Sequence, residues 1–149
     1  MTTITVNAIQ SDTQAQAASV SKKRLWAGRI MSVLPALFLF LDGIMKLVKP
    51  VVVVEATVQL GYPESVILGL GIVLLTCTVL YLIPRTAVLG AILLTGYLGG
   101  AVATHVRVGN PLFSIIFPVI IGAMLWGGLY LRDEQLRSLI PWRRRNKTS

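Results

Sequence analysis

Four long apolar blocks constrain this chain more than any other feature, because each is long enough to cross a lipid bilayer as a helix. They cover residues 25–48, 66–83, 86–106 and 112–131. A helix rises ~1.5 Å per residue, so about 20 residues cross the ~30 Å hydrocarbon core. Only 13% of the 149 residues are charged, against roughly 25% in soluble domains. The sequence therefore predicts an all-α, membrane-spanning four-helix bundle.

Lysine and arginine residues gather beside the first and last blocks, which accounts for most of the net charge of +8. This is the positive-inside pattern, and it predicts a multi-pass membrane protein with both termini in the cytoplasm. The same residues suit contact with the anionic lipids of the bilayer rather than with nucleic acid. The residues concerned are Lys22, Lys23, Arg24, Arg29, Arg85, Arg132, Arg137, Arg143, Arg144, Arg145 and Lys147.

Composition divides the chain into three parts. Residues 1–21 lack Lys and Arg and are rich in Thr, Ser, Gln and Ala, which predicts a disordered polar leader. Residues 22–131 form the bundle, and residues 132–149 form a basic cytoplasmic tail. Between spans 1 and 2 we expect a short extra helix on the outer side, lying at the membrane surface or tucked into the mouth of the bundle. An extended segment is the alternative, but its unpaired strand edge would be costly in lipid.

Small residues mark candidate packing faces. Gly96 and Gly100 form a GxxxG motif in the third block, and Thr104 continues the same stripe. Such motifs let two helices approach closely in lipid, so we expect this stripe to pack against a neighbouring span, with dimerisation as the alternative. Asn110 is predicted to cap the fourth span ahead of Pro111. The single cysteine, Cys77, is interpreted as a small buried apolar residue.

Polar residues gather at the predicted outer mouth of the bundle. Asp42 and Lys46 are spaced i, i+4, with the acid first, which is the favourable order for an ion pair. An ionisable residue in the middle of a span costs on the order of 2.5–3.5 kcal/mol, so Asp42 needs a partner, and Lys46 and His105 are the candidates.

Two interpretations of this polar mouth stay open. The first is a ligand-binding pocket formed by Asp42, Lys46, Tyr97, His105 and Arg107, with Glu55, Gln59 and Tyr62 as lid contacts. The second is a structural ion-pair cluster that sets the register of the helices and reaches the headgroups. No metal site is predicted, because a lone histidine lacks the companion ligands that zinc or haem sites usually have.

Three stretches resemble the DoxX-like family of small bacterial four-span membrane proteins. They are LFLFLDGIMKLVKP, LGYPES and the run from Tyr81 to Asp133, within which GYLGGAVATHVRVGNPLF is the most specific. The resemblance covers about Arg29 to Asp133 and implies a four-helix bundle in the bacterial inner (cytoplasmic) membrane. The recurring positions of the family correspond here to Gly43, Lys46, Gly61, Tyr62, Pro63, Pro84, Arg85, His105, Arg107, Gly109 and Pro111.

The resemblance indicates the fold more clearly than the function, and it identifies no catalytic residue. Some relatives accompany quinone-linked oxidation, so the first hypothesis is an accessory protein that binds a small lipophilic ligand such as a quinone. A redox subunit in which His105 relays protons is the second hypothesis. The third is a membrane assembly factor, or chaperone-like protein, that acts through its surface on a membrane protein partner. A homodimer is a further alternative for the partner.

Overall fold

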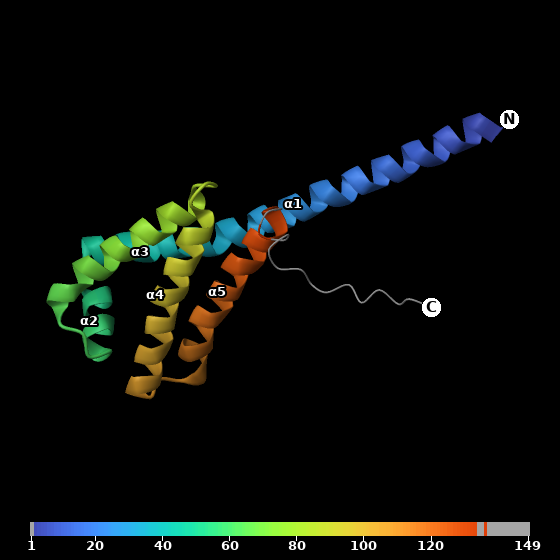
Figure 1. The fold of residues 1–149 in the computed structure, drawn as a ribbon. Helices are drawn as coiled ribbons and strands as arrows, with labels where there is room; N and C mark the ends of the chain where they lie inside the picture. Colours follow the sequence, from blue (N-terminus) through green and yellow to red (C-terminus); the bar gives the residue numbers. More distant parts are fainter. Residues whose placement is uncertain (1, 134–135, 137–149) are drawn as a thin grey trace.

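The computed structural model describes residues 2–133 and 136, and within them every regular element is helical. Along the chain these elements are α1 (Thr2–Val48), α2 (Val51–Gln59), the short 3-10 helix η1 (Glu64–Val66), α3 (Ile67–Leu82), α4 (Ala87–Val108) and α5 (Leu112–Arg132) (Figure 1). The prediction of an all-α fold is confirmed.

Four segments are long and apolar enough to cross a membrane, as the sequence predicts. They are Lys22–Val48, Glu64–Leu82, Ala87–Val108 and Leu112–Arg132. Their bounds differ from the predicted blocks by three residues or fewer at each end. Much of their surface consists of exposed Leu, Ile, Val and Phe side chains, which is favourable only where lipid or another apolar surface covers them.

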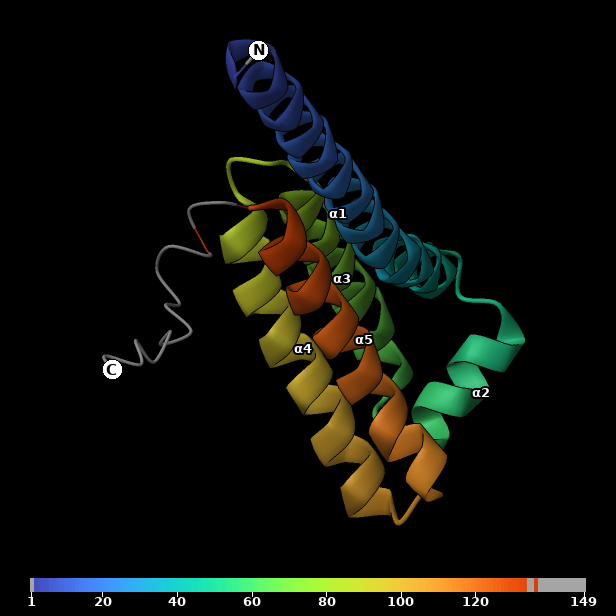
Figure 2. The ribbon, with the colours of Figure 1, turned by 90° about the vertical axis from the view of Figure 1, so that its right-hand side faces the viewer.

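The four long helices pack as a ring rather than as a solid cluster. α1 contacts α3 and α5, and α4 contacts the same two helices. The pair α1 and α3 meets the pair α4 and α5 near the 83–86 connection and the C-terminal end of α5, and from there the pairs diverge (Figure 1). We name this meeting point the closed end. The opposite end, with α2 and the 109–111 connection, is the open end, and α2 occupies the gap there (Figure 2).

Glycine allows the helices of the closed end to approach each other. The position of a side chain at Gly128 is filled by Ser32 of α1, and at Gly90 it is filled by the backbone of Tyr81 in α3. Tyr81 is fully buried and donates a hydrogen bond from its hydroxyl to the Leu125 carbonyl, 2.8 Å away. The Arg132 guanidinium stacks 5.1 Å from the centre of the same ring. These contacts join α3 directly to α5.

Two segments next to the spans are helical in the structure. The structure describes residues 2–20 as the first turns of α1, where the sequence predicts a disordered leader. The segment contains no Gly or Pro and several Ala and Gln residues, which favour a helix. Residues 51–59 form the extra helix predicted between the first two spans, so the extended alternative is wrong. Most of the predicted basic tail lies outside the described residues.

Candidate functional site

A cavity of about 510 Å³ lies between the two diverging helix pairs and beneath α2. This volume falls within the ~300–1,000 Å³ typical of small-molecule sites. The wall is mostly apolar, with polar groups in a few places, as ligand sites usually are. The residues that line it are Phe38, Leu39, Asp42, Lys46, Val52, Val53, Ala56, Thr57, Leu60, Tyr62, Leu70, Gly96, Tyr97, Leu98, Gly100, Ala101, Thr104, His105, Phe117, Pro118 and Ile121.

The GxxxG stripe of α4 lines this cavity. A side chain added at Gly96 or Gly100 would meet no atom within 4 Å. The prediction that the two glycines pack against a neighbouring span is therefore wrong. The physical reason is the divergence of the helix pairs, which carries α4 away from α1 and α3 at this level (Figure 1). Thr104, in the same stripe, is buried.

Asp42 and Lys46 form the ion pair predicted from their spacing. The Lys46 ammonium lies 2.6 Å from the Asp42 carboxylate, and the two side chains are 15% and 35% exposed. Both line the cavity. Each charge therefore has a partner within the bundle, and the pair adds no net charge to the wall. His105, the other partner considered for Asp42, lines the same cavity and bonds elsewhere.

His105 pairs with Asn110 in the connection between α4 and α5. The Asn110 amide nitrogen lies 2.8 Å from Nδ1 of the imidazole. An amide NH₂ group only donates, so with this orientation Nδ1 accepts and a neutral His105 carries its proton on Nε2. The predicted role of Asn110 as a helix cap is wrong, because α5 begins after Pro111 and has no side-chain cap. The sequence of this connection, Gly-Asn-Pro, does not indicate that Asn110 contacts His105.

A chain of hydrogen bonds joins the segment after α2 to the floor of the cavity. The Thr104 hydroxyl donates to the Gly100 carbonyl at 2.8 Å. The Tyr62 hydroxyl lies 2.8 Å from the same Thr104 oxygen and therefore acts as the donor. Tyr62 lines the cavity, as its predicted role as a lid contact requires.

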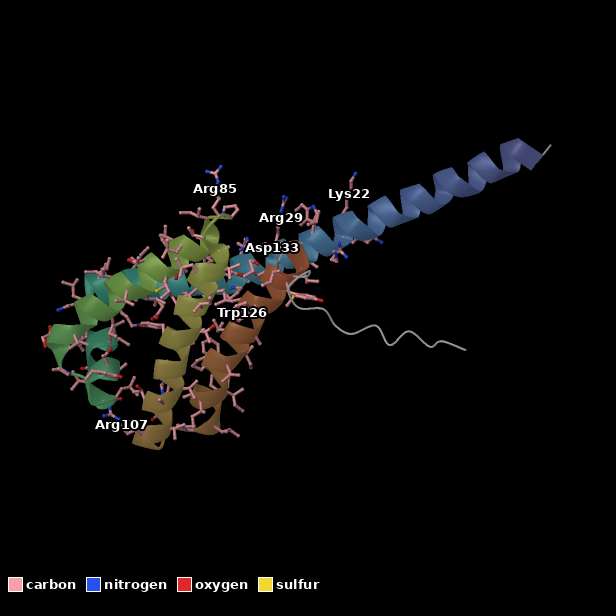
Figure 3. The ribbon with its side chains drawn as sticks, in the orientation of Figure 1. Lys22, Arg29, Arg85, Arg107, Trp126 and Asp133 are labelled. Carbon is pink, nitrogen blue, oxygen red and sulfur yellow. The ribbon has the colours of Figure 1, made fainter. Side chains whose placement is uncertain are left out.

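Arg107 holds α2 from outside the cavity. It is exposed, and its guanidinium donates to the Leu60 carbonyl at 2.9 Å while lying 5.9 Å from the centre of the Tyr62 ring. Figure 3 shows Arg107 beside α2 at the open end. Gly61, with φ of +83°, leaves room for this guanidinium, since a side chain there would meet it at 3.1 Å. The sequence predicts that Arg107 lines the ligand pocket. In the structure it contacts the C-terminal end of α2 from outside the cavity.

The predicted lid residues Glu55 and Gln59 are exposed and do not line the cavity. The face that α2 turns to the cavity carries Val52, Val53, Ala56, Thr57 and Leu60. Glu55 and Gln59 are one helical turn apart and therefore share a face. That face is exposed and is not the one that lines the cavity. Their polarity is therefore directed away from the cavity.

Tyr97 lies in the cavity wall about two helical turns below His105. Its hydroxyl makes no hydrogen bond to any residue that the structure describes, whereas Tyr62 and Tyr81 both have partners. Cys77 is buried at 5% exposure, in agreement with its interpretation as an apolar core residue. Among residues 2–133 and 136, no three His, Cys, Asp or Glu side chains are placed to hold a metal ion together.

Among the described residues, the cavity offers apolar walls, a neutralised ion pair, an imidazole and a phenol without a hydrogen-bond partner. Such a set of groups can hold a small molecule that has both apolar and polar parts. These features define a small, all-helical, multi-pass membrane protein with an internal cavity beneath a short helix.

The model of the DoxX-like family matches residues 30–128, which include most of all four spans and α2. The chain belongs to the DoxX-like family. No curated protein and no solved structure matches it.

Proposed function

We propose that this protein binds a small lipophilic ligand, such as a quinone, in the cavity beneath α2, and serves a membrane redox system as an accessory subunit. The observation that carries the proposal is the cavity itself. Empty apolar volume between packed helices costs stability. A bundle of this size is therefore expected to close such a space unless the space binds something. Here α4 keeps glycine along the wall, and the space stays open.

The polar groups of the wall give the ligand an orientation. Asp42, Lys46 and His105 lie toward the open end of the bundle, and Tyr97 lies deeper. A ligand with an apolar body and a polar group satisfies both kinds of surface. Arg107 and Tyr62 keep α2 in place over it.

We also propose that the open end faces the outside of the cytoplasmic membrane and that both termini are cytoplasmic. Lys22, Arg29 and Arg85 lie at the closed end (Figure 3), together with Arg132. This grouping of basic side chains is the one that positive-inside orientation requires. A phosphatase reporter that is active only outside the cytoplasm tests it: fusion at residue 109 should give activity, and fusion at residue 85 should not.

Native mass spectrometry of the protein extracted in mild detergent tests ligand binding. The wild-type chain should retain a lipophilic molecule that is released at higher collision energy. Asp42→Asn and His105→Ala should lose it, because both remove polar groups of the wall. Gln59→Ala is the matched control, since Gln59 is polar and exposed on the other side of α2.

A wild-type protein that carries no small molecule, while all variants remain folded, would contradict the proposal. Function in cells that survives loss of both Asp42 and His105 would support the assembly-factor alternative instead. In that case the active part of the molecule would be its surface, and the polar wall would serve the register of the helices.

A further inference from the structure

We infer that the ligand of this cavity is a flat ring compound that accepts hydrogen bonds, that Gly96 and Gly100 select it by shape, and that Tyr97 orients it. The inference rests on the proposed function and specifies its ligand class. Three observations support it: the form of the α4 wall, the hydrogen-bonding groups left unpaired, and the aromatic residues on the adjoining helices.

The α4 wall is a trough with a polar aromatic residue at each end. Tyr97 and His105 are eight residues apart, which places their backbones about 12 Å apart along the helix. Between them α4 contributes Leu98, Gly100, Ala101 and Thr104 to the wall, with Gly96 beside Tyr97. Glycine leaves the helix backbone itself as the surface, with no atom within 4 Å of the missing side chains. Such a surface is smooth and suits a flat body.

Aromatic side chains from two other helices adjoin this trough. Phe38 of α1 and Phe117 of α5 line the cavity and contact each other edge to face, with ring centres 5.2 Å apart. A rigid ring placed among them gains aromatic contacts. It also loses less conformational entropy on binding than a flexible chain of the same size. Both effects favour a ring over an acyl chain.

Two groups of the wall offer a hydrogen-bond proton that has no partner among the described residues. The Tyr97 hydroxyl has no partner among the described residues, and neutral His105 presents its Nε2 proton when Asn110 donates to Nδ1. By contrast, the hydroxyls of Tyr62, Thr104 and Thr57 already donate within the protein or to one another. A ligand that enters the cavity therefore meets free donors and is best matched by carbonyl oxygens.

Binding of three probes to the protein in lipid nanodiscs, with empty nanodiscs subtracted, tests the ligand class. Menadione is a flat fused ring with two carbonyl groups, 2-methylnaphthalene is the same ring without oxygen, and 2-undecanone carries one carbonyl on a flexible chain. We expect menadione to bind at least about tenfold more tightly than either of the others, since one lost hydrogen bond costs about five- to tenfold.

Variants test the residues. Tyr97→Phe should weaken menadione about five- to tenfold and leave 2-methylnaphthalene unchanged, because only the donor is removed. Gly100→Val should abolish menadione binding by filling the trough. Gly99→Val is its matched control, because Gly99 is in the same helix and equally free of neighbours but does not line this cavity. It should bind menadione like the wild type.

Equal affinities for menadione and 2-undecanone would overturn the ring inference while leaving a lipophilic ligand in place. Equal loss of binding in Gly99→Val and Gly100→Val would overturn the role of the trough. If Tyr97→Phe weakens 2-methylnaphthalene as much as menadione, Tyr97 acts through packing and its orienting role is wrong. If no probe binds, the inference fails, and the native mass spectrum decides separately on the proposed function.

Discussion

The two ends of this bundle use the same residue for opposite purposes. At the closed end, Gly90 and Gly128 bring helices together until a neighbouring backbone or side chain fills the place of a Cβ atom. Toward the open end, Gly96 and Gly100 have no neighbour there at all. In the first case glycine makes contact possible, and in the second it keeps space free. A glycine motif in a membrane span therefore has to be interpreted together with the direction in which its neighbours run.

The largest effect that sharpens this comparison is expected from Gly90→Ala. The new methyl group would overlap the Tyr81 backbone, and overpacking against backbone that cannot move away should lower the free energy of unfolding by about 3 kcal/mol. Gly100→Ala is the matched change, and it should be neutral or stabilise by up to about 1 kcal/mol through helix propensity. Thermal unfolding in detergent measures both. Equal destabilisation by the two variants would remove the distinction between the ends.

The next effect concerns the ion pair of the open end. Lys46→Met leaves the Asp42 carboxylate without its partner in a half-buried position, so the free energy of unfolding should fall by about 2 kcal/mol. The double variant Asp42→Leu/Lys46→Met should recover most of that loss, because no unpaired charge remains. A double-mutant cycle from denaturant unfolding measures the coupling. Additive losses would show that the two side chains act independently.

The smallest effect should come from the hydrogen bond that holds the segment after α2 against α4. Tyr62→Phe removes the hydrogen bond to Thr104, which is worth about 1 kcal/mol. Amide hydrogen exchange should therefore accelerate in residues 51–59, while the closed end keeps its protection. Tyr130→Phe, the same change in the closed half of α5, is the control. Faster exchange throughout the bundle in Tyr62→Phe would mean that α2 is not an independently opening element.

The sequence predicts the spans and one contact well, because both depend on local spacing. Span length follows from the thickness of the hydrocarbon core, and the Asp42–Lys46 pair follows from the helical repeat. The extra helix is also predictable, since lipid excludes an unpaired extended segment. Cys77 is buried as an apolar residue, which its isolated position in an apolar block indicates.

The remaining site contacts join segments that are far apart along the chain. Tyr62 is paired with Thr104, and Arg107 reaches the Leu60 carbonyl, so their roles depend on how α2 meets α4. The side of α2 that faces the cavity also depends on this meeting, so the polarity of Glu55 and Gln59 does not show that they lie away from it. The spacing of residues within one helix does not indicate how the two helix pairs diverge. That divergence decides that Gly96 and Gly100 line a cavity.

The ring-like packing of the four helices sets the order in which the molecule is completed. Gly28 of α1 lies against Leu131 and Gly128 of α5, so α1 finds this partner only after α5, which follows it in the chain, has been made. Until then the ring of helices is an incomplete arc. Closure of the bundle, and with it the shape of the cavity, therefore waits for the synthesis of α5.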